Sequence, residues 1–308
     1  MKTSSRQSRD ASPTLADWGE DRVVAALTRN LAAGSDVIVG AGDDCAVIGR
    51  KRDARWQLLK TDAVVEGVHF LPVEDAQRIG WKALCRAISD IAAMGGQPAH
   101  ALITLAVSPS TSVARVQALY AGLRKAGRKY GVAIVGGETS RSPGPLFLSI
   151  TLTGWVEREY CVLRSGGKAG DLLYVTGRLG GSLAGKHLDF QPRVEEARWL
   201  AAHHRPRAMM DLSDGLGADL PRLATASGCS YAIDEASLPL TRGCTPTQAM
   251  TDGEDFELLF AIAPRTAPAL EAAWKKRFPK LPLTQIGRLL HPSSLTPHPS
   301  RHGYDHFA

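Results

Sequence analysis

The chain has 308 residues, of which 44% are hydrophobic and 22% are charged, a composition that is ordinary for a folded globular protein and excludes a disordered one. This length predicts two domains of roughly 150 residues each. The net charge of +6 lies at the ends of the chain: the first ten residues contribute +2, and seven basic against two acidic residues contribute +5 over 264–308. Because the body between is near neutral and shows no basic helix face interleaved with aromatics, we expect no nucleic-acid partner.

The cysteines and the N-terminus indicate the cellular compartment. Five widely spaced cysteines without a Cys-x-x-Cys pair argue against a disulfide framework or a zinc site and favour a reducing cytoplasm. The N-terminal stretch MKTSSRQSRDASPT lacks an apolar core, and no window reaches 18 apolar residues. The sequence therefore predicts no signal peptide and no membrane span. Residues 1–14 are expected to be a disordered tail.

In the first half of the chain, short strands alternate with long helices. Apolar spacing predicts a helix from Trp18 to Leu31, ended by Gly34. The next elements are expected to be strands over 37–39 and 56–59, a helix over 75–94, a strand over 100–108, a helix over 113–130, and strands over 132–137 and 146–156. This mixed order indicates an α/β or α+β fold.

Apolar patterning weakens near residues 157–170, and we place a domain boundary there. The sequence thus predicts an N-terminal domain over 15–156 and a C-terminal domain over 157–308. The second is expected to hold strands over 171–177, 231–233, 256–262 and 284–290, and helices after Gly180, over 193–204, from the motif MMDLSDG to about Ala226, and over 265–277.

The stretch GGSLAGKH, Gly180 to His187, contains the spacing G-x-x-x-x-G-K of a phosphate-binding P-loop. A P-loop needs Ser or Thr after its Lys to reach Mg²⁺, and this chain has His187 there. We therefore interpret these glycines as serving tight packing between a strand and a helix.

Acidic residues stand at the ends of several predicted elements or inside an apolar helix. They are Asp43-Asp44, Thr61-Asp62, Asp90, Glu138, Asp211 and Asp214. A single Asp at a strand end is most often a turn or helix cap. Asp90 is harder to explain in that way, because its neighbours Ile88 and Ile91 are apolar and a buried lone carboxylate costs several kcal/mol.

Asp90 needs a cation, and Arg86 is the only basic residue within helical reach, so a metal ion is the alternative. Oxygen donors without His or Cys at ligand spacing favour a hard ion, Mg²⁺ or Mn²⁺. Glycines in GAGDD, VGGET and SDGLG let backbone N–H groups approach phosphates. The residues alone thus indicate Mg²⁺-dependent nucleotide or phosphate chemistry.

The ordered set of motifs resembles the thiamine-monophosphate kinase family, within the superfamily of aminoimidazole ribonucleotide synthetase. The motifs are GAGDDCAVI, LLKTDAVVEGVHF, KALCRAISDIAAMGGQPA, IVGGETS, RSGGKAGDLLYVTG, DLSDGLGADL, GEDFELLF and the terminal GYDHF. The resemblance implies a two-domain mixed α/β fold whose N-terminal halves pair in a homodimer. It also implies direct, ATP-dependent phosphorylation of thiamine monophosphate to thiamine diphosphate, the last step in making that cofactor.

The resemblance further implies roles for individual residues. Several Mg²⁺ ions would be held by Asp44, Thr61, Asp62, Asp90, Asp211 and Asp214. Gly137 and Glu138 would lie at the nucleotide and its metal, Ser213 near the nucleotide, and Arg164 at its phosphates, where it supports the transition state. His69, Glu254 and Arg301 would face the substrate, and no residue acts as a covalent nucleophile. A packing histidine and a solvated turn residue remain the alternatives for His69 and Glu254.

Four departures from the family pattern bear on the site. Glu138 replaces the usual Asp, Asp252 replaces a glycine, Arg301 replaces an aromatic, and Lys60 precedes Thr61-Asp62 where a small residue is common. Lys60 shares a strand face with Asp62 and is expected to be able to stand in for one metal. The segment 240–251 is short for the family, which suggests a trimmed helix. The alternatives are another ATP-using member of the superfamily, or a catalytically weak protein that binds nucleotide or thiamine phosphate.

Overall fold

The computed structural model of the protein describes residues 13–294 and 303–307, which form two compact units. The smaller contains the chain up to Ala32 together with the residues from Asp305 onward, and the larger runs from Ala33 to Tyr304. Both β-sheets belong to the larger unit. None of the helices in the described residues combines the length and the apolar character that spanning a membrane requires. All five cysteines are described, and all are free thiols.

The smaller unit holds the helices α1 (Leu15–Trp18) and α2 (Glu20–Thr28). Thr14 begins α1 with a capping box, and Gly19, at φ 70°, separates the two helices. The Asp305 carboxylate accepts the N–H of Glu20 at 3.2 Å. The helix predicted over 18–31 corresponds to α2, which is shorter, because Gly19 with its positive φ precedes it and the helix ends at Thr28. The expected tail, residues 1–14, lies mostly outside the described residues.

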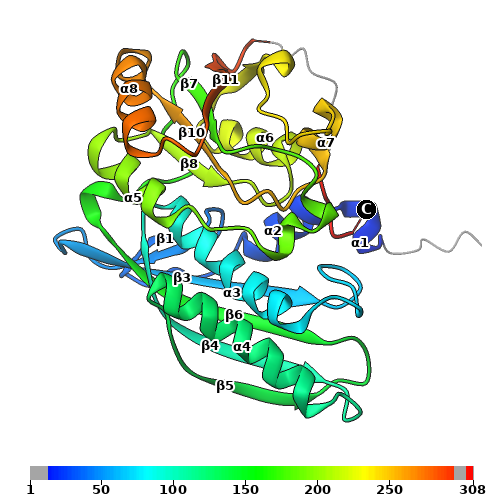
Figure 1. Ribbon diagram of the computed structural model, residues 1–308. Helices are drawn as coiled ribbons and strands as arrows, with labels where there is room; N and C mark the ends of the chain where they lie inside the picture. Colours follow the sequence, from blue (N-terminus) through cyan, green and yellow to red (C-terminus); the bar gives the residue numbers. More distant parts are fainter. Residues whose placement is uncertain (1–12, 295–302, 308) are drawn as a thin grey trace, which may run out of the picture. The chain divides into compact units, whose positions relative to one another are not determined.

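The first sheet has six strands in the order β1-β2-β3-β6-β4-β5. They are β1 (Val37–Val39), β2 (Ala46–Ile48), β3 (Arg55–Val65), β4 (Gln97–Val107), β5 (Ala133–Arg141) and β6 (Phe147–Glu157). Neighbouring strands are antiparallel except β4 and β5, which are parallel. Helices α3 (Ala76–Ala93) and α4 (Val113–Tyr130) cover one face of this sheet (Figure 1).

Helices α3 and α4 approach so closely that their contact requires glycine. A Cβ on Gly80 would lie 2.0 Å from the backbone oxygen of Leu119, and a Cβ on Gly122 would lie 1.9 Å from that of Gln77. No side chain fits at these distances, so the two backbones touch. Helix α3 is consequently buried along most of its length, and it also contacts the second half of the chain.

The second sheet has five strands in the order β8-β10-β7-β11-β9, with every neighbouring pair antiparallel. The strands are β7 (Leu172–Thr176), β8 (Ala208–Asp211), β9 (Ser230–Ile233), β10 (Leu258–Ile262) and β11 (Leu283–Leu290). The helices of this half are α5 (Val194–His203), α6 (Leu216–Ala226), α7 (Pro246–Thr251) and α8 (Ala267–Arg277). Tyr174 and Phe260 on one face join a core shared with α3, α5 and α8, whereas Val175 and Leu259 on the other face pack with α6 and α7. The predicted mixed α/β fold is confirmed.

Strands β3 and β5 extend well beyond their predicted ends. Strand β3 pairs with β6 along its whole length, from Arg55 opposite Glu157 to Val65 opposite Phe147, because the two long strands form an unbroken ladder. Thr61 and Asp62 therefore lie inside β3 and not after it, and Glu138 likewise lies inside β5. The alternation of side chains along these strands decides which face each residue occupies.

The segment after Gly180 is not the predicted helix. It forms two short 3-10 turns, Ser182–Ala184 and Lys186–Leu188. The N–H of Gly180 donates to Asp255 at 3.0 Å, and that of Gly181 donates to Asp252 at 2.8 Å. Lys186 also lies 3.3 Å from Asp255. Asp252 and Asp255 thus bind the backbone N–H groups and the lysine that a P-loop would offer to a phosphate. This supports a packing role for the glycines.

Candidate active site

Helix α3 carries a stripe of polar side chains through the core. Lys82, Arg86 and Asp90 are spaced four residues apart, so they lie on one face of the helix. The Lys82 side chain is fully buried, and those of Arg86 and Asp90 are only 13% and 10% exposed. Buried charges need partners, and here these come from segments distant in the sequence.

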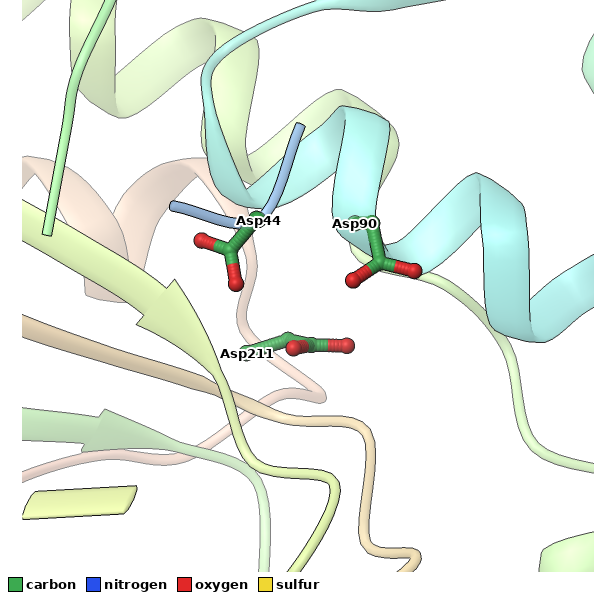
Figure 2. A group of neighbouring side chains, drawn as sticks. All are labelled: Asp44, Asp90 and Asp211. Carbon is green, nitrogen blue, oxygen red and sulfur yellow. The ribbon is translucent and has the colours of Figure 1, made fainter. Parts of the chain in front are cut away.

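Three buried carboxylates converge at the C-terminal end of this stripe. Asp44 comes from the loop before β2, Asp90 from α3, and Asp211 from the last residue of β8. Ligand oxygens of the three lie within 4.8 Å of one another, and the carboxylates surround a common space (Figure 2). We call these three residues the acidic cluster. It unites the first sheet, its covering helix and the second sheet.

The donor set of the acidic cluster fits a hard divalent cation. The Oδ2 atom of Asp44 is buried and has no hydrogen-bond partner. Buried acceptors without a partner are rare in proteins, so this oxygen indicates a missing ligand. Carboxylate oxygens are the ligands that Mg²⁺ prefers. Asp211 is oriented by a 2.5 Å hydrogen bond that it accepts from the Ser89 hydroxyl. The residues present therefore suit Mg²⁺ or Mn²⁺.

Two basic side chains border the acidic cluster. Arg164 donates to Asp44 Oδ1 from Nη2 at 2.6 Å and from Nε at 3.1 Å. Lys60 donates from Nζ to Asp90 Oδ1 at 2.7 Å. Asp43 accepts the backbone N–H of both Asp44, at 3.0 Å, and Arg164, at 3.1 Å. Asp43 thus fixes the turn. Part of the positive charge that Asp90 needs comes from a lysine of β3.

The pKa values of these carboxyl groups reflect crowding of negative charge. Burial, followed by the charge of Asp44, raises the pKa of both Asp211 and Asp43 to about 6. Burial also raises the pKa of Asp90 well above its ordinary value, although Lys60 opposes this effect. The acidic cluster therefore favours the binding of further positive charge.

A second group of charges surrounds Glu254 at the other end of the stripe. Glu254 has a positive φ of 53°. Its carboxylate accepts from Lys82 Nζ at 2.7 Å and Arg86 Nη1 at 3.0 Å, and lies 3.1 Å from His187 Nδ1. Burial would raise the pKa of Glu254, but His187, Lys82 and Arg86 together hold it at about 2. Glu254 is therefore a buried, paired carboxylate and not a solvated turn residue.

Lys82 joins three segments at this end of the site. Besides Glu254, its ammonium contacts the backbone oxygen of His69 and lies 2.7 Å from His187 Nδ1. Burial lowers the pKa of Lys82 to about 8, with Glu254 acting in the opposite direction. The His69 ring is fixed as well, because its Nδ1 accepts the N–H of Val65 at 3.1 Å.

Arg86 connects the two groups of charges. Its Nε donates to Asp62 Oδ2 at 2.9 Å, while its Nη1 reaches Glu254. Although burial would raise it, the charges of Arg86 and Lys60 lower the pKa of Asp62. Lys60 and Asp62 both point from β3 toward α3, as their shared strand face predicts.

The motif DLSDG forms the third side of the site. The backbone oxygen of Ser213 accepts the N–H of Glu254 at 2.7 Å, so these two loops lie side by side. Asp214 pairs with Arg222 of α6, which also contacts Asp219 at 3.1 Å. The backbone oxygen of Asp214 accepts the N–H of Tyr304 at 2.9 Å, which connects the terminal GYDHF motif to this loop.

Asp62 and Asp214, predicted as metal ligands, lie outside the acidic cluster and are paired with arginines instead. Thr61, Gly137 and Glu138 do not join it either. Thr61 is exposed on the opposite face of β3 from Asp62, 3.5 Å from the Ser149 hydroxyl. Gly137 and Glu138 lie on β5, which is three strands from β3, or about 14 Å across the sheet. Arg301 lies outside the described residues.

Sequence reasoning missed the residues that balance the charge. Lys82, His187 and Arg222 were not assigned to the site, and Arg86 was considered only as a neighbour of Asp90. A lysine four residues before Arg86 in an otherwise apolar helix is a signal that could have been used for Lys82. His187 and Arg222 offered no such signal, since their partners lie far away along the chain.

Comparison with known proteins identifies the family of the chain. The chain matches the AIR synthase related protein family, its N-terminal domain over residues 42–156 and its C-terminal domain over 168–296. A thiamine-monophosphate kinase from Rhodopirellula baltica is 40% identical over 272 residues, covering 82% of this chain and 84% of the relative. That of Bacillus subtilis is 33% identical over 281 residues, covering 82% and 86%. A solved structure of AaThiL complexed with AMPPCP and TMP aligns with a TM-score of 0.80 at 30% identity, covering 96% of this chain and 99% of that one.

The two halves of the chain thus belong to the N-terminal and C-terminal domains of the AIR synthase related proteins. At this level of identity and coverage, the chain belongs to the thiamine-monophosphate kinase family.

Proposed function

We propose that this protein transfers the γ-phosphoryl group of ATP to the phosphate of thiamine monophosphate, forming thiamine diphosphate and ADP. The observation that carries the proposal is the orphaned Oδ2 of Asp44 within the acidic cluster, with the basic groups around Glu254 at the other end of the same helical stripe. Relatives in the family bear the name of this activity, and AaThiL was solved with an ATP analogue and TMP.

The transfer needs positioning and charge neutralisation more than acid–base chemistry. A phosphate oxygen of thiamine monophosphate forms a bond to the γ-phosphorus, while the bond from that phosphorus to the β–γ bridging oxygen breaks and ADP leaves. The attacking phosphate is already anionic at neutral pH, so the chain needs neither a covalent nucleophile nor a strong general base. Arg164, which already forks onto Asp44, donates to the phosphate oxygens as charge moves to the leaving group.

Asp44, Asp90 and Asp211 would hold Mg²⁺, which when bound neutralises the triphosphate charge. We assign Asp62 and Asp214 to the edge of the same metal site. Each is paired with an arginine, Arg86 and Arg222 respectively, and a bound cation would free these guanidinium groups for phosphate oxygens. Ser213 is expected to contact the nucleotide from the adjoining loop.

His69, Glu254 and Arg301 are proposed to face thiamine monophosphate. Because Nδ1 of His69 accepts a backbone N–H, a neutral ring carries its proton on Nε2, where it can donate to a phosphate oxygen. Glu254 stays ionised at neutral pH and holds Lys82 and Arg86 at this end of the site.

We further propose a homodimer formed through the face of the first sheet that α3 and α4 leave open. Leu59, Leu102 and Val135 on this face are 37%, 47% and 60% exposed. Ile103 and Leu105 of β4 point into the core, so Thr104 between them points to the open face. Glu138 is paired in register with Thr104 and therefore lies on the open face as well. A second copy packed here is the route by which Gly137, Glu138 and Thr61 would reach an ATP site.

The remaining assignments follow from the same proposal. Residues 15–156 would form the ATP- and metal-binding dimerisation domain, and residues 157–308 would complete the nucleotide and substrate sites. A cytoplasmic location stays a prediction from the cysteine pattern.

A turnover assay tests the function. Purified protein with ATP, MgCl₂ and thiamine monophosphate is expected to form ADP and thiamine diphosphate in equal amounts, measured by chromatography. Asp62→Asn and Asp214→Asn should abolish turnover while the circular dichroism spectrum is unchanged. Binding of both ligands without product would contradict the kinase proposal.

A further inference from the structure

We infer that the ammonium group of Lys60 is a resident cation of the acidic cluster, occupying the place of one divalent ion beside Asp90. The inference rests on the proposed metal-dependent function. It concerns how many ions this chain binds, a property separate from whether it turns over its substrate.

Lys60 lies where a metal ion on Asp90 would bind. Its Nζ lies 2.7 Å from Asp90 Oδ1, and an oxygen of Asp90 is within 4.8 Å of oxygens of Asp44 and Asp211. A Mg²⁺ ion on Asp90 Oδ1 would lie about 2.1 Å from that oxygen, hence within about 5 Å of the ammonium. Two cations at that separation in a buried site repel strongly, so the lysine and an ion compete for this oxygen.

The backbone holds Lys60 in this place. Residue 60 is inside β3, paired with Leu152 of β6, and its side chain shares the core-facing side with Leu58 and Asp62. The lysine side chain is 23% exposed. Its ammonium group forms a direct ion pair with the Asp90 carboxylate, and this contact keeps the side chain directed into the acidic cluster.

Charge balance leads to the same conclusion. With all three carboxyl groups ionised, as in a metal-binding site, the acidic cluster carries three negative charges, and Arg164 and Lys60 each neutralise one of them through a direct contact. Arg86 does not contribute here, because Asp62 and Glu254 engage it. Without Lys60 the cluster would keep two unbalanced charges, which is the charge of one further divalent ion.

Counting Mn²⁺ tests the inference directly. Bound Mn²⁺ is measured by electron paramagnetic resonance at saturating AMPPCP for the wild type and for Lys60→Met, which keeps the stem and removes the charge. We expect Lys60→Met to bind one more Mn²⁺ per chain than the wild type. Lys60→Arg, which keeps the charge, and Lys168→Met, the same substitution at an exposed lysine, should bind the wild-type number. An equal count in Lys60→Met and the wild type overturns the inference.

A measurement on the wild type covers the case in which Lys60→Met fails to fold. Crystals grown with Mn²⁺ and AMPPCP would show ions by anomalous diffraction. We expect no Mn²⁺ within bonding distance of the Asp90 oxygen that accepts from Lys60. An ion on that oxygen, with the lysine turned away, overturns the inference. Absence of turnover in the assay above would instead refute the kinase proposal. The Mn²⁺ count and the anomalous diffraction would still test the role of Lys60.

Discussion

The guanidinium group of Arg164 binds Asp44 Oδ1 across 120 residues of sequence, at 2.6 Å from Nη2, and leaves Asp44 Oδ2 buried without a partner. The two oxygens of one carboxylate thus have different environments. One is fixed by an arginine from the segment that leads into the second half of the chain, and the other points to where an ion would bind. Arg164 therefore orients the proposed metal ligand Asp44 in addition to its proposed contact with phosphate.

Substitution of Arg164 should remove both contributions. We expect Arg164→Ala to lower kcat by about 10²–10³-fold, as for the loss of a donor to developing charge, and to raise the KM for ATP. Arg164→Lys should recover only part of the rate, because an ammonium cannot form the forked contact with Asp44. Steady-state kinetics with varied ATP measures both effects. A wild-type kcat in Arg164→Ala would remove this residue from the mechanism.

The crowding of carboxylates predicts an unusual dependence of stability on pH. Because the folded pKa of Asp211 is raised to about 6, the folded protein binds a proton between about pH 4 and 6 that the unfolded chain lacks. The contribution of Asp211 to stability therefore falls as pH rises through this window. In EDTA, Asp211→Asn should raise the Tm clearly at pH 7.5 and much less at pH 5.5.

The control for this experiment is Asp189→Asn, which alters an exposed ion pair with Arg78. Thermal unfolding of both variants and the wild type at the two pH values isolates the titration of Asp211 from that of the histidines. A lower Tm for Asp211→Asn at pH 7.5 would show that the carboxylate is already balanced by its neighbours.

The residues of the acidic cluster could be found in the sequence because each contradicts its surroundings. Asp90 interrupts an apolar helix, Asp211 ends the apolar strand β8, and Asp44 lies in the loop between the apolar strands β1 and β2. A buried carboxylate needs compensation wherever the fold places it, so local pattern made these residues candidates, together with Asp62, Glu138 and Asp214, and the family resemblance implied their role as metal ligands. The structure places the three within 4.8 Å of one another.

The partners could not be found in the same way. The sequence predicts Lys60 on the strand face of Asp62, but its contact with Asp90 depends on how β3 lies against α3, and His187 meets Lys82 across 105 residues. The faces of Thr61 and Glu138 depend on how far β3 and β5 extend, which is decided by hydrogen bonding to neighbouring strands. The predicted helix after Gly180 fails for a similar reason, since Asp252 and Asp255 engage its glycines from 71 and 75 residues away.

The buried contacts of Lys82 predict a large effect on stability. Lys82→Met leaves Glu254 and His187 without their shared cation, and breaking a buried charge pair costs about 3–5 kcal/mol. Arg78→Met removes an exposed pair with Asp189 and should cost about 1 kcal/mol or less. Urea denaturation measures both free energies of unfolding. Similar values for the two variants would mean that Lys82 is not the structural centre of this end of the site.

The open face of the first sheet predicts the assembly state. Leu59→Glu combined with Leu102→Glu places two charges on the apolar surface proposed for the dimer and should produce a monomer at micromolar concentration. Light scattering after gel filtration gives the mass. The matched control is Val73→Glu, a 90% exposed residue in a loop, which should leave the mass of the wild type unchanged. A dimer that persists in the double variant would place the interface elsewhere.

His69 is the residue whose substitution best separates the substrate from the nucleotide. Its ring is fixed by the Val65 N–H and its backbone oxygen by Lys82, so the proposed Nε2 donor has a defined position. A hydrogen bond to a charged group contributes about 1.5–3 kcal/mol, so His69→Ala should raise the KM for thiamine monophosphate by about 10-fold or more. The KM for ATP should change much less, and His291→Ala, at an exposed histidine, should change neither. If His69→Ala instead raised the KM for ATP more than that for thiamine monophosphate, His69 would belong to the nucleotide side, and Glu254, which shares Lys82 with it, would have to be reassigned as well.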